Sequence, residues 1–254
     1  MISREQLNKF ISNVNMDGEK QDRVYHYKKI VAVSPHPDDM ELLAGGLMKL
    51  YTSNSRDVDL IVVSDGRKGS LGYMDEETLI DIRRDEQLQA AKVLGLKKVH
   101  FLEYVDSEVP CPRILRKKIL PLIRELAPDL VITVDPFLPY ESHLDHVNTG
   151  KAVMESVLFF EHGGIEKGYA GGKRPDLLLA GTAYPNIIVD IEKYFGDKEA
   201  AIKCHISQFE STDYIFKAIN TLENAYGKLI GSDHGEPFRL LYSNELHLNT
   251  VINL

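Results

Sequence analysis

The chain has 254 residues, 43% of them hydrophobic, which is enough to fill one α/β core and too little length for two well-filled domains. We expect a single domain over residues 1–254, with a helical lead-in over about residues 1–28. The 30 basic and 38 acidic residues give a formal net charge of -8 without any basic tract, so nucleic acid is not an expected partner.

The sequence also lacks the signals of a membrane protein or a disulfide-rich protein. No apolar run approaches the roughly 20 residues that cross a bilayer, and residues 1–5 are too polar to begin a signal peptide. Only Cys111 and Cys204 occur, and neither lies in a Cys-x-x-Cys pair, so we expect neither a disulfide framework nor a cysteine metal site. These features predict a cytoplasmic protein without a membrane partner.

Short runs rich in β-branched residues alternate along the chain with helix-like stretches. The predicted strands are residues 29–33, 58–63, 99–102, 130–134, 177–179 and 187–191. Two intervening segments, 79–94 and 115–126, carry apolar residues at three- and four-residue steps and stop at Gly95 and before Pro128. This alternation predicts an α/β fold with a mostly parallel sheet between two layers of helices. The glycine-rich residues 163–172 predict a loop.

Polar side chains gather directly after the first and the fourth predicted strands. The first cluster is Ser34-Pro-His-Pro-Asp-Asp39, and the second ends in His143-Leu-Asp-His146. In open parallel sheets, the carboxyl ends of the strands form the edge at which ligands bind. Each cluster contains two candidate ligands three residues apart, which face one point if the chain turns helically there: His36 with Asp39, and His143 with His146.

Two histidines and one carboxylate from these clusters supply the three ligands of a catalytic zinc site and leave a position open for water. Fe²⁺, Co²⁺ and Mn²⁺ fit the same donors. A simpler interpretation is that His-Pro or Asp-Asp at a strand end caps the following helix. Two such clusters at one sheet edge favour a metal site, and Zn²⁺ is the cofactor we expect.

Further motifs accompany these clusters: Asp65-Gly66-Arg67 after the second strand, and Arg83-Arg-Asp-Glu86 on the first predicted helix. Together the motifs resemble those of the LmbE/PIG-L family of zinc-dependent N-deacetylases, and most closely its archaeal diacetylchitobiose deacetylase branch. The resemblance covers roughly residues 29–208. It implies a Rossmann-like three-layer sandwich and a homo-oligomer.

The resemblance also implies roles for the residues of the two clusters. His36, Asp39 and His146 would bind the metal ion. Asp38 would be the general base, and His143 the electrophilic or acid group. A competing interpretation is that Asp38 only caps the helix after the first strand.

Four more residues receive supporting roles. Arg83 and Asp106 would bind sugar hydroxyls, although Arg83 could instead be a solvated helix residue. Tyr140 lies near the position of an oxyanion-stabilising tyrosine in some relatives. The Asp145 carboxylate would lie beside His143 and keep its imidazole protonated.

Two positions depart from the family pattern. Met40 stands where the family has glutamate after Asp-Asp, and Glu41 is displaced by one residue, so we expect a tuned site rather than a lost one. Val105-Asp106-Ser107 replaces the family's Pro-Asp-Gly.

The expected activity is hydrolysis of an amide, the N-acetyl group of an N-acetylglucosamine-containing saccharide such as diacetylchitobiose, as in chitin degradation. Alternative substrates are a thiol conjugate or a glycolipid. A different class of function is a non-catalytic sugar-binding module with a structural metal. Asp38 argues against that class, because a binding protein has no use for a further carboxylate beside the metal.

Overall fold

The computed structural model describes residues 8, 11, 14–69, 75–168, 172–209 and 213–247 of the chain. The strands are β1 (Lys29–Ser34), β2 (Asp57–Ser64), β3 (Lys98–Tyr104), β4 (Leu130–Val134), β5 (Asp176–Ala180), β6 (Ile187–Asp190) and β7 (Gly235–Leu241). The α-helices are α2 (Gly18–Arg23), α3 (Asp39–Ser53), α4 (Glu76–Leu94), α5 (Pro112–Leu126), α6 (Leu144–Leu158), α7 (Phe195–Ile202), α8 (Ile206–Phe209) and α9 (Asp213–Leu229). Short 3-10 helices are η1 (Val24–His26), η2 (Glu192–Tyr194) and η3 (Ser243–Glu245).

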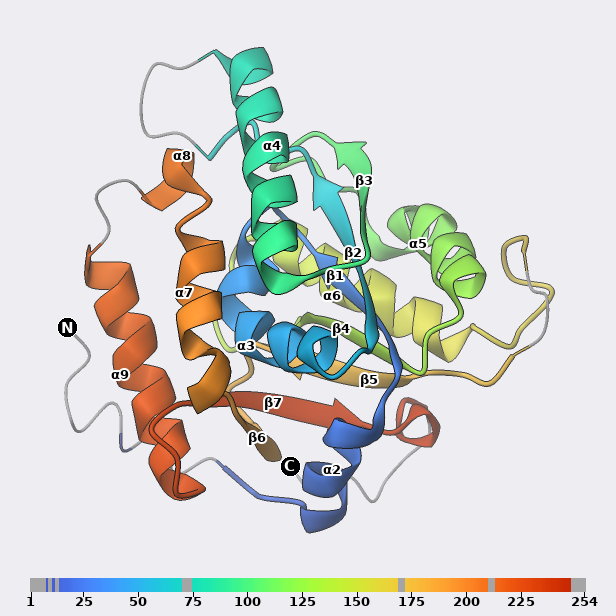
Figure 1. Cartoon of the computed structure of the whole chain (residues 1–254). Helices are drawn as coiled ribbons and strands as arrows, with labels where there is room; N and C mark the ends of the chain where they lie inside the picture. The colour runs from blue at the N-terminus through green and yellow to red at the C-terminus, as the bar shows by residue number, and fades with distance from the viewer. Residues whose placement is uncertain are drawn as a thin grey trace.

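Within the described residues, the strands form one sheet in the order β3-β2-β1-β4-β5-β7-β6 (Figure 1). Neighbours from β3 to β5 are parallel, whereas β7 runs antiparallel to both β5 and β6. The six predicted strands and the mostly parallel sheet are confirmed, with strand ends shifted by at most two residues. The sequence did not predict β7, because Glu236, Pro237 and Arg239 interrupt its apolar run.

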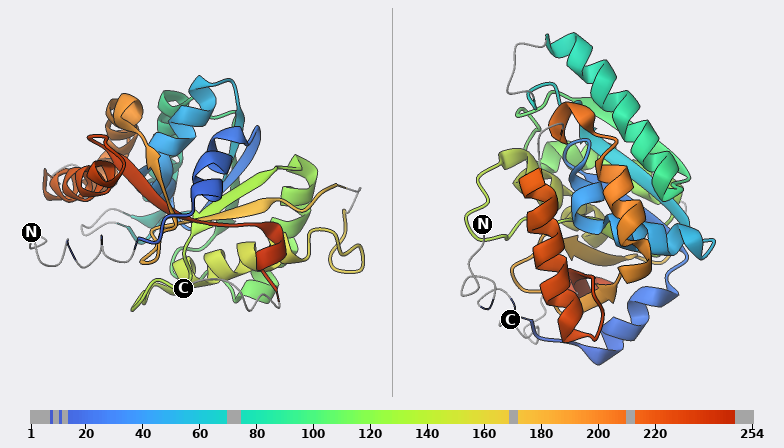
Figure 2. Two further views of the ribbon diagram at one scale, coloured as in Figure 1. Left: turned by 90° about the horizontal axis from the view of Figure 1, so that it is seen from below. Right: turned by 60° about the vertical axis from the view of Figure 1, so that its left-hand side comes forward.

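Helices cover both faces of the sheet, as predicted (Figures 1 and 2). Helices α3, α4 and α7 contact one another on one face, and α5 packs with α6 on the other. The side chains of β1 alternate accordingly: Ile30 and Ala32 join the cluster beneath α3, and Val31 and Val33 join the cluster beneath α5 and α6. Both faces of the strand are therefore buried, which explains its unbroken apolar run.

Predicted helix ends are confirmed at Gly95, which has a left-handed φ of 74° after α4, and at Leu126, the last residue of α5. Residues 169–171 of the glycine-rich stretch lie outside the described residues. In the described part of the chain, no helix combines the length and the apolar character needed to span a membrane.

The strand order places the two polar clusters side by side. Strands β1 and β4 are neighbours, but the chain leaves β1 into α3 on one face and leaves β4 into α6 on the other. A crevice forms where consecutive connections diverge in this way, and ligands of open α/β folds bind there. The fold therefore brings both clusters to one point.

Gly150 of α6 lies against the end of β4, and a Cβ there would come within 2.7 Å of the Val134 carbonyl oxygen. We expect Gly150→Ala to lower the free energy of unfolding by about 1–3 kcal/mol, as measured by urea denaturation. Gly196→Ala in α7 is the matched control, because none of the described atoms lies within 4 Å of its added Cβ. The control should leave stability unchanged or raise it by up to about 1 kcal/mol. Equal stability of the two variants would contradict this packing.

Candidate metal centre

The chain turns sharply between β1 and α3, and this turn positions the first cluster. Asp38 adopts φ 101° and ψ -29°, a left-handed conformation that is uncommon outside glycine and often marks a functional site. The His36 N–H donates to Asp39 Oδ2 at 2.9 Å, and the Ser34 hydroxyl donates to the His36 carbonyl at 2.6 Å. These bonds fold the His36 side chain back toward the Asp39 carboxylate.

His36, Asp39 and His146 each offer one ligand atom, and the three atoms lie within 4.8 Å of one another. Asp39 Oδ2 is 3.1 Å from His36 Nδ1 and 3.4 Å from His146 Nε2. His146 comes from the first turn of α6, so the ligands span the crevice between β1 and β4. The structure therefore brings together the predicted ligand set, whose two imidazole nitrogens and one carboxylate oxygen fit a catalytic zinc ion.

The other ring nitrogen of His36 faces two buried carboxylates. His36 Nε2 is 3.2 Å from Asp106 Oδ1 and 3.2 Å from Asp145 Oδ2. A carboxylate in this position fixes the tautomer of a metal-binding histidine and directs its other nitrogen to the metal. Asp145 also accepts the backbone N–H groups of Ser107 at 2.7 Å and Val109 at 3.2 Å. The Asp145 carboxylate thus supports His36, which corrects its predicted pairing with His143.

These contacts shift the pKa values of the cluster strongly. Burial lowers the pKa of His36, but the contacts with Asp106, Asp145 and Asp39 outweigh it and raise the pKa to about 12. Burial raises the pKa of Asp39, but the bond from His36 and the charge of His146 outweigh it, and the pKa is lowered overall. The cluster therefore favours positive charge beside Asp39, which a divalent cation supplies when it displaces the imidazole proton.

Asp38 makes no hydrogen bond through its side chain to the first amides of α3, although it occupies the N-cap position. Its Oδ2 instead lies 3.0 Å from Arg83 Nη2. Arg83 is 3% exposed and also donates to the carbonyls of Gly66 at 2.8 Å and Pro37 at 2.6 Å. The helix-cap interpretation of Asp38 and the solvated interpretation of Arg83 are therefore both wrong.

The Asp65-Gly66-Arg67 motif fixes the loop on which this pair depends. Gly66 has φ +69°, and a Cβ there would lie 2.6 Å from Arg83 Nη1, so only glycine leaves room for the guanidinium. Asp65 Oδ1 accepts the N–H groups of Arg67 at 3.2 Å and Asp106 at 3.3 Å. One carboxylate thus links the loop after β2 to the loop that carries Asp106.

Gln87 and Glu41 form a buried chain behind Asp38. Gln87 Oε1 accepts the Asp38 N–H at 3.2 Å, and Gln87 Nε2 donates to Glu41 Oε1 at 2.6 Å. Burial raises the pKa of Glu41 to about 7. The displaced glutamate thus reaches Asp38 through Gln87. The sequence analysis missed Gln87, although its four-residue spacing from Arg83 places both on one face of α4.

His143 completes a group of three imidazoles. Its ring centroid lies 4.7 Å from that of His36 and 5.2 Å from that of His146. His143 Nδ1 accepts the Asp145 N–H at 3.3 Å, which leaves Nε2 to carry the proton in the neutral ring. The backbone of Asp145, rather than its carboxylate, therefore orients His143.

An open pocket of about 220 Å³ lies beside the metal residues. It is lined by His36, Asp38, Lys68, Gly69, Arg83, Asp106, Ser107, His143 and Gln208. The sequence analysis did not predict Lys68, Ser107 or Gln208 as site residues. Glu86 anchors α8 by accepting the Ser207 N–H and hydroxyl, each at 2.7 Å, and so brings Gln208 to the pocket.

The predicted substrate contacts divide into two groups. Arg83 and Asp106 line the pocket, but Arg83 is bonded to Asp38, and Asp106 contacts His36 and accepts the Lys68 N–H at 3.0 Å. The structure does not bring Tyr140 to the site, because this residue is fully exposed on the loop between β4 and α6.

We expect the purified chain to bind one zinc ion and His146→Ala to lose it, because the variant removes one of three ligands from a site that already leaves one position open. The measurement is the zinc content of the extensively dialysed parent and variant, determined by mass spectrometry. His26→Ala removes an exposed histidine outside the cluster and should retain the metal. Full zinc content in His146→Ala would show that the ion lies elsewhere.

Several known proteins are similar in sequence to this chain. The profile of the PIG-L family, described as GlcNAc-PI de-N-acetylase, matches residues 31–157. The diacetylchitobiose deacetylase of Thermococcus kodakarensis is 33% identical over 87% of this chain and 86% of its own length. A Bacillus anthracis protein described as a probable N-acetyl-alpha-D-glucosaminyl L-malate deacetylase 2 is 29% identical over 72% of this chain and 82% of its own.

The fold agrees with these matches. The crystal structure of N,N'-diacetylchitobiose deacetylase from Pyrococcus horikoshii superposes with a TM-score of 0.84 and 33% identity, covering 91% of this chain and 90% of the other. The profile match spans both polar clusters, and the superposition extends over the sheet that carries them. The chain therefore belongs to the PIG-L family of N-deacetylases.

Proposed function

We propose that this chain is a zinc-dependent hydrolase that removes the N-acetyl group from N-acetylglucosamine-containing saccharides such as diacetylchitobiose. The observation that carries the proposal is the position of Asp38: a buried carboxylate, held by Arg83, that lines the open pocket beside a set of three metal ligands. The two archaeal relatives, which are named for deacetylation of diacetylchitobiose, support the choice of substrate.

Asp38 has the environment of a general base. Burial raises its pKa to about 8, the Arg83 charge opposes this rise, and the neighbouring Asp39 charge adds to it. A carboxylate with a raised pKa binds a proton more strongly than an exposed one, and proton transfer is most efficient when the pKa lies near the working pH. The Arg83 charge favours the ionised form of Asp38, which burial alone disfavours.

The proposed reaction uses Asp38 twice. Zn²⁺ held by His36, Asp39 and His146 would lower the pKa of a water molecule and polarise the acetamido carbonyl. Asp38 accepts a proton from the attacking water as the water oxygen adds to the carbonyl carbon. Asp38 then donates that proton to the amine nitrogen as the C–N bond breaks, which leaves acetic acid, a free amino sugar and an ionised Asp38.

His143 is placed to stabilise the negative charge that develops on the carbonyl oxygen. Its Nδ1 is occupied by the Asp145 N–H, so Nε2–H is free to donate. A preoriented donor of this kind stabilises a developing charge effectively, because it needs no reorganisation during the reaction. The backbone bond from Asp145 supplies the orientation.

The pocket lining suits a sugar more than an apolar ligand. Lys68, Ser107 and Gln208 line its wall, and polar residues of these types can bind sugar hydroxyls. A thiol conjugate or a glycolipid could present the same acetamido sugar, with the difference lying in the attached group. A sugar-binding module would have no need of the buried Asp38–Arg83 pair.

We expect Asp38→Asn and Asp38→Ala to lower kcat for amine release about 10²–10⁴-fold, because each removes the proton acceptor and donor. Asparagine also tolerates the left-handed conformation at this position. The measurement is release of free amine from N-acetylglucosamine and diacetylchitobiose, together with the zinc content of each variant. Asp81→Asn, which changes an exposed carboxylate on α4, should behave as the parent.

Different outcomes separate the parts of this proposal. A parent chain that binds metal but releases no amine from acetylated sugars or thiol glycosides would rule out the deacetylase. Full activity in the Asp38 variants would remove Asp38 as the base while leaving the metal site in place. Activity confined to a thiol conjugate or a glycolipid would replace the saccharide with that substrate.

Arg83 tests the electrostatic part of the proposal. Its charge lowers the pKa of Asp38, so Arg83→Met should raise that pKa further and shift the acid limb of the kcat/KM profile to higher pH. Arg83→Lys keeps the charge and should shift the limb less, although it loses the paired donors. An unchanged acid limb in Arg83→Met would mean that Asp38 does not control it.

A further inference from the structure

Helix α3, which begins with the metal-binding turn, is broken near its middle. Ala44 has φ -146° and ψ 15°, outside the helical region. The break separates a short first segment, residues 39–43, from a second segment, residues 45–53. The first segment contains Asp39 and Glu41, and Asp38 directly precedes it. Whatever fixes the two segments relative to each other therefore fixes these carboxylates.

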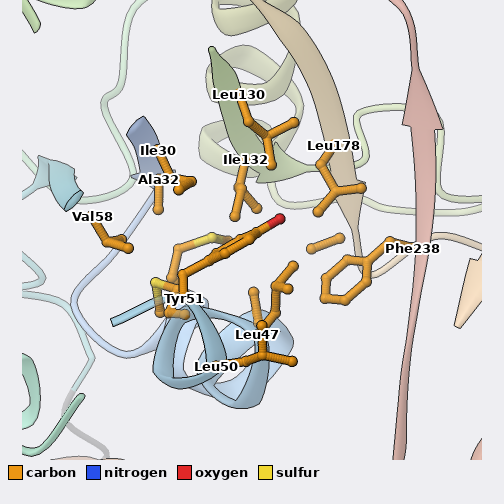
Figure 3. Close-up of a cluster of buried hydrophobic side chains, with 14 of the residues drawn as sticks. Ile30, Ala32, Leu47, Leu50, Tyr51, Val58, Leu130, Ile132, Leu178 and Phe238 are labelled. Carbon is orange, nitrogen blue, oxygen red and sulfur yellow. The ribbon is translucent and has the colours of Figure 1, made fainter. Parts of the chain in front are cut away.

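The second segment is held firmly in the core. Leu47, Leu50 and Tyr51 all belong to the hydrophobic cluster on this side of the sheet, and Figure 3 shows Leu47 and Tyr51 among side chains such as Ile132 and Phe238. The first segment has only about one helical turn and cannot be stable alone. Its direction depends on how the chain is held at the break.

Glu236, on β7, caps the start of the second segment. One carboxylate oxygen accepts the Gly46 N–H at 2.8 Å, and the other accepts the Leu47 N–H at 2.8 Å. Amides that follow a break in a helix need such an acceptor, and a carboxylate is a strong one. Glu236 is 1% exposed, so this cap lies wholly inside the protein.

Lys198 of α7 compensates the buried charge of Glu236. Its ammonium nitrogen is 2.7 Å from Glu236 Oε1 and also contacts Glu223 of α9. The stem of Lys198 crosses α3 closely, because a Cβ on Gly45 would lie 3.0 Å from its Cγ. Gly45 therefore admits the lysine at the point where the helix breaks, and Gly46 leaves room for Ile191.

We propose that Glu236 and Lys198 are positioning residues that set the direction of the first segment of α3, and through it the placement of Asp38 and Asp39. In the described contacts, Glu236 and Lys198 touch none of the three metal ligands. They act through the backbone of α3. The effect on catalysis rests on the proposed deacetylase function, whereas the effect on the metal site does not.

The test is Glu236→Gln, which keeps the size of the side chain but removes its charge and replaces one of the two oxygens that accept the α3 amides with an NH₂ group, which cannot accept. We expect zinc affinity, measured by competition with a chelator, to fall about 10- to 100-fold, as for other supporting residues of metal sites. We expect kcat for amine release to fall about 10- to 100-fold with KM changed less than about threefold, since misplaced groups mainly slow the chemical step.

Glu223→Gln is the matched control. It alters the same lysine but makes no contact with the α3 amides, so zinc affinity and kcat should remain within about twofold of the parent. Gly45→Ala provides a second test if Glu236→Gln does not fold, because its added Cβ displaces the Lys198 stem. We expect it to weaken zinc binding in the same direction as Glu236→Gln, but less.

Measurements are made below the melting transition of each variant, so that a purely structural role cannot imitate the result. Parental zinc affinity in both Glu236→Gln and Gly45→Ala, with only a lower melting temperature, would overturn the positioning role. Equal losses in Glu223→Gln would also overturn it. If the parent releases no amine, the proposed function fails, and zinc affinity alone still decides the role of Glu236.

Discussion

The crowding of buried carboxylates around one imidazole is the constraint on which this structure depends. Each residue of the group is at most 9% exposed, and the group comprises Asp38, Asp39, Glu41, Asp106 and Asp145 near His36. Removing a carboxylate from water costs several kcal/mol unless donors or cations replace the lost hydration. The loops, the left-handed residue and the choice of neighbours at this end of the sheet all serve that replacement.

Each carboxylate draws a different part of the chain inward. The Asp145 carboxylate accepts two backbone N–H groups of the loop after β3, and Asp106 accepts one from the loop after β2. Asp38 accepts the guanidinium of Arg83 on α4. Four connections that are distant in sequence therefore converge at the crevice. The charge of Asp39 is compensated mainly by His36 and His146, and a divalent cation held by these three residues would compensate it further.

The sequence was sufficient for six of the seven described strands and for the clusters, because strands such as β1 and β4 are buried on both faces and have unbroken apolar runs. It was not sufficient to predict which groups the site residues contact. Asp145 stands between His143 and His146, and spacing alone cannot say that its carboxylate turns instead to His36. Gln87 was missed for a related reason: the sequence alone does not distinguish a glutamine on the buried face of a helix such as α4 from a solvated one.

Met40 shows how the family site is rebuilt here. The side chain is 0% exposed and packs in the hydrophobic cluster beneath α3, so the position after Asp-Asp serves the core. Glu41 and Gln87 then support Asp38 from the adjacent position. Met40 faces the core and Glu41 faces the site, so this short segment must keep a fixed orientation about its helix axis. A rotation by one residue position would place Glu41 where Met40 lies. The cap at the break, made by Glu236 of the unpredicted strand β7, holds the far end of that segment against such a rotation.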